Sequence, residues 1–237
     1  MILGVITARG GSKAIPRKNV KMVADKPLIA WTILAAKGSS GLGRVLVSTD
    51  DPEIAEVSSQ WGADVPFTRP ASLAQDLSSH IDVVIHAIDW VEQNQAVKLN
   101  YVLLLQPTVP FRSSEDIDSA IQLAYKMDAD SVVSVYPCER HPFLSKQITE
   151  DGRLKDFVFR IESDLPRQTL PPAYTLNGAI YLIKPQVLKE RHSWYSDNTY
   201  AYVMPPERSM DIDSEWDLYV ADLILRDKMR HEKHKDS

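Results

Sequence analysis

Short apolar runs alternate with amphipathic stretches along most of this chain. The runs are rich in aliphatic and β-branched residues, which is typical of strands buried on both faces. They predict strands at residues 2–7, 44–48, 101–105, 131–135, 176–183 and 200–204. Apolar positions spaced by three or four residues predict helices at residues 28–37, 53–60, 81–91, 115–127 and 214–231. Because parallel strands need crossover connections, this alternation predicts a Rossmann-like α/β fold with a doubly wound, mostly parallel sheet.

The alternation stops between residues 137 and 174. This stretch contains five prolines, and a turn at Gly152 separates two short strand-like pieces around Ile148 and Phe157. It is too long and irregular for a simple connection, so we expect a protruding arm. The arm divides the sequence into an α/β domain of residues 1–136 and 175–237 and an insertion of residues 137–174.

Composition limits the classes of function that are open to the chain. With 237 residues, 44% of them hydrophobic, the sequence is long enough for one substantial domain. The formal net charge of -5 disfavours a nucleic acid partner. The single cysteine, Cys138, cannot form an internal disulfide, and no apolar run is long enough to span a bilayer. We therefore expect a cytoplasmic protein with no nucleic acid and no membrane as partner.

A glycine-rich basic loop follows the first predicted strand. Adjacent glycines let a backbone turn tightly and approach a ligand, and cations placed there can hold phosphate oxygens. The spacing matches neither G-x-G-x-x-G nor G-x-x-x-x-G-K-[ST], so an ordinary glycine turn with solvated charges stays open. Its position at the carboxyl end of a strand, where open α/β sheets bind ligands, favours a nucleotide. The segment comprises Ala8, Arg9, Gly10, Gly11, Ser12 and Lys13, followed by Arg17, Lys18 and Asn19.

Two carboxylates precede the last predicted helix. Asp211 and Asp213 flank Ile212, and in extended backbone residues at i and i+2 face the same side. Two oxygen ligands suit Mg²⁺, which completes its coordination with water and substrate phosphates. The alternative is that Asp213 caps the helix while Asp211 is solvated.

Polar residues at other loop positions are further candidates. Gln106 follows the strand at 101–105 and could contact a base or sugar, or belong to a capped turn. Arg69 lies in a polar loop before a helix that Ser79 could cap.

The arm and the strand after it carry three more candidates. Arg167, beside Gln168, could hold a carboxylate through its planar fork, or be an inert surface arginine. Asn177, beside Gly178, could contact a sugar or form a turn.

Taken together, these motifs resemble those of the CMP-sialic acid synthetases, also called N-acylneuraminate cytidylyltransferases. The resemblance runs from Ile2 to about Leu225. It implies a nucleotidyltransferase domain, a homodimer formed through the arm, and dependence on Mg²⁺. The implied reaction transfers CMP from CTP to the anomeric hydroxyl of N-acetylneuraminic acid or a close sialic acid and releases pyrophosphate.

The resemblance also implies a role for each matching residue. Arg9, Lys13, Asp211 and Asp213 would be catalytic, the two aspartates as Mg²⁺ ligands. Gln106, Arg167, Gln168 and Asn177 would bind the sugar acid. The nucleotide would contact Ala8, Arg9, Gly10, Gly11, Ser12, Lys13, Lys18, Asn19, Arg69 and Ser79.

Two departures from the family pattern leave the acceptor open. Leu144 stands where some sialate enzymes have a lysine, and His80 replaces a serine of some relatives. A synthetase for legionaminic, pseudaminic or another 3-deoxy-2-ulosonic acid is therefore an alternative. A non-catalytic nucleotide-binding homologue is another. An NAD-dependent oxidoreductase is disfavoured because its glycine fingerprint is missing.

Overall fold

A six-stranded mixed sheet forms the centre of the molecule. The computed structural model describes residues 1–158 and 170–235. The strand order is β10-β6-β9-β5-β1-β4, in which β9 runs antiparallel to both of its neighbours and the other pairs are parallel. The strands are β1 (Ile2–Thr7), β4 (Arg44–Ser48), β5 (Tyr101–Leu105), β6 (Ser131–Pro137), β9 (Tyr174–Ile183) and β10 (Thr199–Val203). The predicted α/β fold with a mostly parallel sheet is confirmed.

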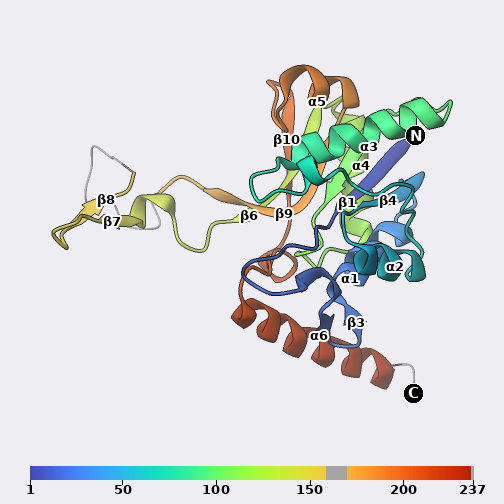
Figure 1. Ribbon diagram of the computed structural model, residues 1–237. Helices are drawn as coiled ribbons and strands as arrows, with labels where there is room; N and C mark the ends of the chain where they lie inside the picture. The colour runs from blue at the N-terminus through green and yellow to red at the C-terminus, as the bar shows by residue number, and fades with distance from the viewer. Residues whose placement is uncertain (159–169, 236–237) are drawn as a thin grey trace.

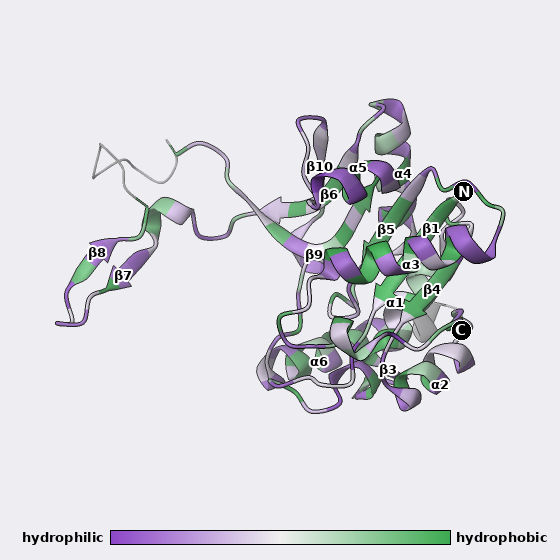
Figure 2. Ribbon diagram, turned by 45° about the horizontal axis from the view of Figure 1, so that its top comes forward, coloured by the Kyte–Doolittle hydropathy of each residue, from purple (hydrophilic) through white to green (hydrophobic). Residues whose placement is uncertain are grey.

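Helices cover both faces of the sheet. Alternate residues of β1 point to opposite sides, so Ile6 packs in a core with α1 and α4, while Val5 packs in another with α3 and α5. Figure 2 shows the hydrophobic residues concentrated along the central strands. A third core lies under α6 and includes Ile15 and Ile212. The helices are α1 (Leu28–Gly38), α2 (Pro52–Gln60), α3 (His80–Asn94), α4 (Ser114–Lys126), α5 (Pro185–Arg191) and α6 (Glu215–Lys235).

Several short elements were not predicted from the sequence. The helix α5 has only seven residues, too few to show a helical period. A small antiparallel pair, β2 (Met22–Val23) and β3 (Lys26–Pro27), precedes α1. Among residues 1–158 and 170–235, four 3-10 turns lie in loops: η1 (Lys18–Val20), η2 (Ala71–Leu73), η3 (Pro142–Leu144) and η5 (Pro206–Arg208).

The stretch between β6 and β9 projects from the body, as Figure 1 shows. It carries a hairpin of β7 (Lys146–Ile148) and β8 (Leu154–Asp156). At its base Pro137 pairs with Tyr174, and the Cys138 amide donates to the Ala173 carbonyl at 2.8 Å. The arm therefore leaves and re-enters the sheet through two adjacent antiparallel strands.

The ends of the central strands place the predicted site loops beside one another. The Ala8 amide donates to the Ser48 carbonyl at 3.1 Å, which joins the glycine loop to the end of β4. The Ile212 amide donates to the Thr108 carbonyl at 2.9 Å, which joins the two-aspartate segment to the turn after β5. The loops thus meet at the carboxyl edge of β1, β4 and β5. Within the described residues, no helix is long and apolar enough to cross a membrane.

Candidate functional site

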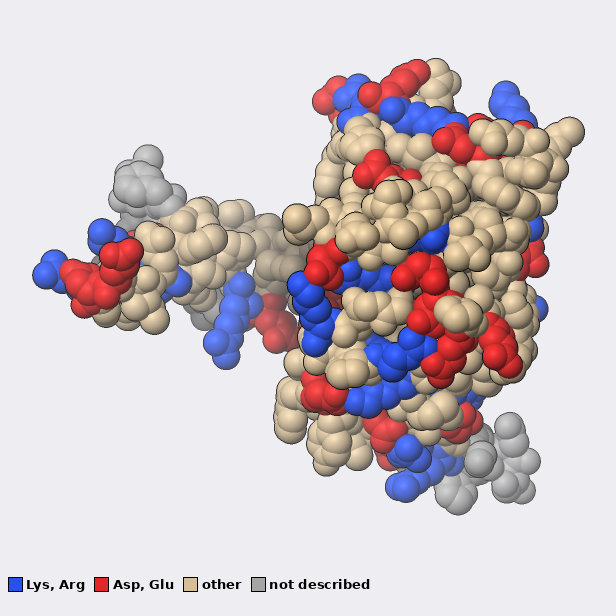
Figure 3. All heavy atoms as spheres, viewed as in Figure 1, with Lys and Arg blue, Asp and Glu red and all other residues tan. Residues whose placement is uncertain are grey.

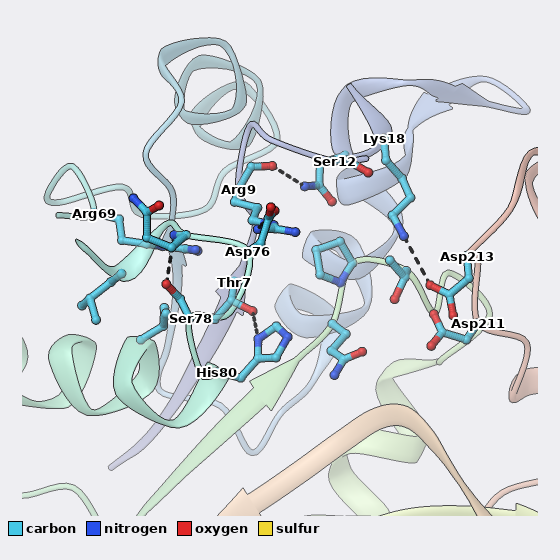
Figure 4. Close-up of a pocket in the computed structure, with 17 residues that line it drawn as sticks. Thr7, Arg9, Ser12, Lys18, Arg69, Asp76, Ser78, His80, Asp211 and Asp213 are labelled. Carbon is cyan, nitrogen blue, oxygen red and sulfur yellow. Dashed lines mark hydrogen bonds and ion pairs between the residues drawn. The ribbon is translucent and has the colours of Figure 1, made fainter. Parts of the chain in front are cut away.

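A pocket of about 270 Å³ opens at this edge of the sheet. Its lining includes four residues of the basic loop: Arg9, Ser12, Lys18 and Asn19. Four predicted residues from other loops also line it, namely Arg69, Gln106, Asp211 and Asp213 (Figure 4). Figure 3, viewed from the same side as Figure 1, shows Lys and Arg side chains near the middle of the face in view, with Asp and Glu directly beside them. Eight predicted site residues are therefore brought together in one cavity.

Two cations of the basic loop, Arg9 and Lys13, are paired with the carboxylate of Asp76. Arg9 donates through Nη1 to Asp76 Oδ1 at 2.9 Å, and the Lys13 ammonium contacts the other oxygen of the same carboxylate. Lys13 is 78% exposed and is not among the pocket-lining residues. Asn19 holds the loop from within, because its Nδ2 donates to the Arg9 carbonyl at 3.1 Å.

The two glycines have different surroundings. A Cβ on Gly10 would lie 2.5 Å from Asp51 Oδ2, whereas one on Gly11 would meet nothing within 4 Å. The Gly10 amide already donates to Asp50 Oδ1 at 3.2 Å. Close packing against Asp51, the N-cap of α2, thus favours glycine at position 10, whereas no contact requires glycine at position 11. Ala8 is buried at the end of β1.

Arg69 is a buried cation at the back of the pocket. Only 5% of the residue is exposed, and its Nε donates to Ser48 Oγ at 3.1 Å. Burial lowers the pKa of Arg69 to about 10, so the guanidinium still carries its charge at neutral pH.

His80 and Ser79 lie at the start of α3. His80 lines the pocket, and its Nδ1 lies 2.9 Å from Thr7 Oγ1 (Figure 4). Desolvation, together with the nearby charges of Arg69 and Arg9, lowers the pKa of His80 and leaves the imidazole neutral at pH 7. Ser79 caps α3 by accepting from the Ile81 amide at 3.1 Å, and it does not line the pocket.

The two aspartates on the opposite side differ strongly in environment. Asp211 Oδ1 is buried without a hydrogen-bond partner, whereas the Asp213 side chain is 79% exposed. Burial raises the pKa of Asp211, which Thr108 and Lys18 only partly oppose. Lys18 Nζ donates to the Ile212 carbonyl at 2.7 Å and lies 3.6 Å from Asp213 Oδ1. Ser214, not Asp213, accepts from the Asp217 amide at the start of α6.

This pair of carboxylates fits a divalent cation. Asp211 offers an oxygen that no protein group satisfies, and Asp213, two residues further along the same loop, offers a second. Within the described part of the chain, no cluster of three or more acidic, histidine or cysteine residues could hold a metal. Two carboxylates with the remaining positions left to water and phosphate is the usual arrangement for Mg²⁺.

Gln106 enters the pocket beside a glycine with a left-handed backbone. Gly178 has φ of 71°, and a Cβ there would lie 2.8 Å from Gln106 Oε1. A side chain at Gly178 would therefore displace the Gln106 amide. The neighbouring Asn177 is 2% exposed and donates to Ser209 Oγ at 2.9 Å. Asn177 therefore holds the loop at Ser209 in place and does not line the pocket.

A buried arginine that the sequence did not single out supports the Gln106 turn. Arg112 is 3% exposed and donates to the Ala179 carbonyl at 2.8 Å and to Thr32 Oγ1 at 2.7 Å. It also approaches the Gln106 carbonyl at 3.4 Å. Burial lowers the pKa of Arg112 to about 9. No sequence signal for this role exists, because its partners come from distant elements.

A buried carboxylate supports the two-aspartate segment. Asp116 is 1% exposed and accepts two hydrogen bonds from Arg208, each of 2.9 Å, and one from Tyr202 at 3.0 Å. Burial would raise the pKa of Asp116, but these hydrogen bonds and that of the Ser113 amide outweigh it and hold the pKa low. Sequence patterning showed Asp116 only as part of a helix start. The remaining predicted residues, Arg167 and Gln168, lie outside the described residues.

Comparisons with known proteins identify the family of this chain. A family model described as Cytidylyltransferase matches residues 3–200. The CMP-N,N'-diacetyllegionaminic acid synthase of Legionella pneumophila is 39% identical over 226 residues, which cover 94% of this chain and 96% of that protein. An N-acylneuraminate cytidylyltransferase of Streptococcus agalactiae is 34% identical over 90% of this chain, which spans 50% of that protein.

A solved structure shows the same fold. The CMP:2-keto-3-deoxy-manno-octonic acid synthetase complexed with CTP matches 96% of this chain and 99% of its own, with a TM-score of 0.72. Its sequence identity is 17%, so the likeness concerns the arrangement of the elements alone.

Proposed function

This chain belongs to the cytidylyltransferase family and is related to the CMP-sialic acid and CMP-legionaminic acid synthetases, and from that premise we propose its reaction. It transfers CMP from CTP to the anomeric hydroxyl of a nine-carbon ulosonic acid and releases pyrophosphate. The observation that carries the proposal is the single pocket that joins the basic loop, Gln106 and the unsatisfied Asp211 carboxylate.

The relatives favour a legionaminic-type acceptor over N-acetylneuraminic acid, which the sequence motifs placed first. The Legionella synthase, whose name specifies N,N'-diacetyllegionaminic acid, is the more identical of the two relatives and is matched over 96% of its length. The N-acylneuraminate enzyme is matched over half of its length. We therefore propose a diacetylated nonulosonic acid of the legionaminic class as the acceptor.

The pocket supplies positioning and charge for this transfer. The anomeric hydroxyl oxygen of the sugar attacks the α-phosphorus of CTP and loses its proton to solvent water. An O–P bond forms while the bond from that phosphorus to the oxygen bridging to the β-phosphate breaks in line with it, and pyrophosphate leaves. Arg9 and Lys13 stabilise the charge that accumulates on the departing pyrophosphate. Arg69 and the neutral His80 would contact the nucleoside, and Gln106 would contact the acceptor.

Asp211 and Asp213 would hold Mg²⁺ at the edge of the pocket. When bound, the cation supplies Lewis-acid stabilisation of the phosphate oxygens. The role of Lys18 is to hold the loop that carries both aspartates. Its ammonium donates to the Ile212 carbonyl and forms an ion pair with Asp213.

Pyrophosphate release with CTP and a panel of acceptors tests the proposal. N,N'-Diacetyllegionaminic acid should give the largest kcat/KM, followed by its stereoisomers and then N-acetylneuraminic acid. Preference for N-acetylneuraminic acid would overturn the choice of acceptor but keep the reaction. No release with any ulosonic acid would overturn the reaction and favour a non-catalytic nucleotide-binding role.

The arm supports a homodimer. Ile148, Leu154 and Phe157 are 74%, 69% and 69% exposed on the projecting hairpin, an apolar surface that a second copy could bury. Light scattering should give twice the mass of the chain, and Ile148→Ser with Phe157→Ser should shift it toward the monomer. A monomeric wild-type protein would contradict this part of the proposal.

The placement of Arg167 and Gln168 at the acceptor carboxylate is also part of the proposal. Arg167→Gln should raise KM for the sugar acid with little change in KM for CTP, because only the acceptor carries a carboxylate. Lys155→Gln, which neutralises another cation of the arm, is the matched control. The opposite pattern, a change confined to CTP, would contradict the assignment.

A further inference from the structure

Asp76 binds both of the cations proposed to hold the triphosphate. One of its oxygens accepts from Arg9 Nη1 at 2.9 Å, and the other contacts the Lys13 ammonium. A carboxylate that bridges two cations in this way presents anionic oxygens where a phosphate group would present its own. Figure 4 shows Arg9 and Asp76 side by side at the centre of the pocket, and Asp76 is one of its lining residues.

The loop that carries Asp76 is otherwise tied to itself. The Gln75 amide donates to Ser78 Oγ at 2.9 Å, and the Gln75 side chain donates to the Ala71 carbonyl at 2.8 Å. The Ser78 hydroxyl donates to the Ser72 carbonyl at 3.3 Å. In the described part of the chain, the Asp76 ion pairs are thus the polar link from this loop to the basic loop. The tip of the loop, Leu77, is 98% exposed, so apolar packing does not hold it there.

The position of Asp76 suits a displaceable group. Its side chain is 46% exposed, Lys13 is 78% exposed and Arg9 is 32% exposed, so all three can separate and regain water without leaving a buried charge. Arg69 differs, because it is buried and hydrogen-bonded to Ser48, so its position is fixed by the fold.

We propose that Asp76 is an internal anion that competes with the triphosphate of CTP for Arg9 and Lys13, and that it returns to these cations when pyrophosphate leaves. The inference rests on the proposed function only in taking Arg9 and Lys13 as triphosphate ligands. Asp76 keeps the basic loop ordered before CTP binds, weakens the binding of polyphosphates, and limits product inhibition by pyrophosphate. It is an affinity-setting residue, and it takes no part in bond making.

Calorimetric titration with inorganic tripolyphosphate, in the absence of any sugar acid, tests this directly. Asp76→Asn should bind the probe roughly three- to tenfold more tightly than wild type, which is the range expected for the loss of exposed ion pairs. Pyrophosphate should become a stronger inhibitor of turnover by a similar factor, and KM for CTP should fall while KM for the sugar acid is unchanged.

Two further variants separate competition from general electrostatics. Asp76→Glu keeps the carboxylate and should stay close to wild type. Glu53→Gln removes one negative charge that pairs with Arg17 of the same basic segment, so it controls for the change in net charge. It should alter tripolyphosphate binding by less than twofold. An equal gain in Glu53→Gln and Asp76→Asn would overturn the proposal in favour of long-range attraction.

The remaining outcomes are equally decisive. Weaker tripolyphosphate binding by folded Asp76→Asn would show that the carboxylate only positions the cations, and unchanged binding would show that the ion pairs have no effect; either overturns competition. The proposed reaction fails separately, through absent pyrophosphate release from CTP with every ulosonic acid, because the tripolyphosphate titration needs no turnover.

Discussion

The basic and acidic sides of the pocket satisfy their charges in opposite ways. On the basic side, Lys13 is exposed and Arg9 is half-buried, and the two share a carboxylate of the same chain. On the acidic side, Asp211 is largely buried and one of its oxygens has no partner. On the proposed function, the first side would exchange one anion for another, whereas the second presents a carboxylate oxygen that no protein group satisfies and that a cation could bind. The four predictions below test this contrast.

The largest effect is expected for the buried carboxylate. Asp211→Asn should lower kcat by roughly 100-fold or more, since metal stabilisation of transition-state charge is worth several kcal/mol. The same change should stabilise the fold by about 1 kcal/mol, because an unsatisfied buried charge is removed. Pyrophosphate release and thermal unfolding measure the two effects. Normal Mg²⁺-dependent turnover in this variant would show that Asp211 is not a ligand.

The second largest effect is expected for Asp116, which supports the loop of the two aspartates, and it is a loss of stability. Asp116→Ala removes the acceptor of Arg208 and Tyr202 and should reduce the free energy of unfolding by about 2–3 kcal/mol. The pKa of Asp116 is held below its ordinary 3.8, so its contribution is complete above about pH 4 and is lost as the pH falls through the lower folded value. Denaturant unfolding should therefore show a smaller difference between wild type and variant at pH 3 than at pH 7. A difference that does not change with pH would contradict this origin.

On the basic side, loss of one cation should be a milder change. Arg9→Gln should raise KM for CTP roughly tenfold, because a net hydrogen bond to a charged group is worth about 1.5 kcal/mol. Arg17→Gln is the matched control, since Arg17 pairs with Asp51 and Glu53 outside the lining of the pocket. An equal rise in KM for CTP in the two variants would show that Arg9, which lines the pocket, has no more effect on CTP binding than Arg17, which does not.

The smallest effect is expected for the exposed member of the acidic pair. Asp213→Asn should reduce kcat by roughly tenfold, less than Asp211→Asn, because its side chain is 79% exposed and water can replace its oxygen. Titration of activity with Mg²⁺ should show a raised requirement for the cation in this variant. A loss as large as that of Asp211→Asn would mean that burial does not rank the two carboxylates.

The sequence predicted the core well for a simple physical reason. Strands such as β1 and β5 are buried on both faces, so they appear as continuous apolar runs, and their predicted bounds match the structure. The Ser113 cap of α4 is a local interaction, and a serine just before a predicted helix is the residue type that favours it. The orientation of β9 was not predicted, since pairing direction depends on how a distant arm returns to the sheet.

The site was predicted only in part, because several of its interactions join distant positions. The pairs Arg9–Asp76 and Arg208–Asp116 span 67 and 92 residues, and no local pattern links their members. Gly10 was expected to let a ligand approach the backbone, yet the group that approaches its Cα is the carboxylate of Asp51. The residue types in the loops indicated phosphate and metal binding, but only the fold shows which cations pair with which carboxylates.

The base of the arm makes the molecule modular. Because Pro137 and Tyr174 are paired partners on neighbouring strands, the chain between them starts and finishes at one point of the sheet. Lengthening or replacing that segment adds only a slowly growing loop-closure entropy and leaves the register of β6 and β9 in place. Natural variation can therefore remodel the arm while the pocket is preserved. A cassette exchanged at these two residues would transplant the arm of a relative, with its own residues at the positions of Arg167 and Gln168, onto an unchanged sheet.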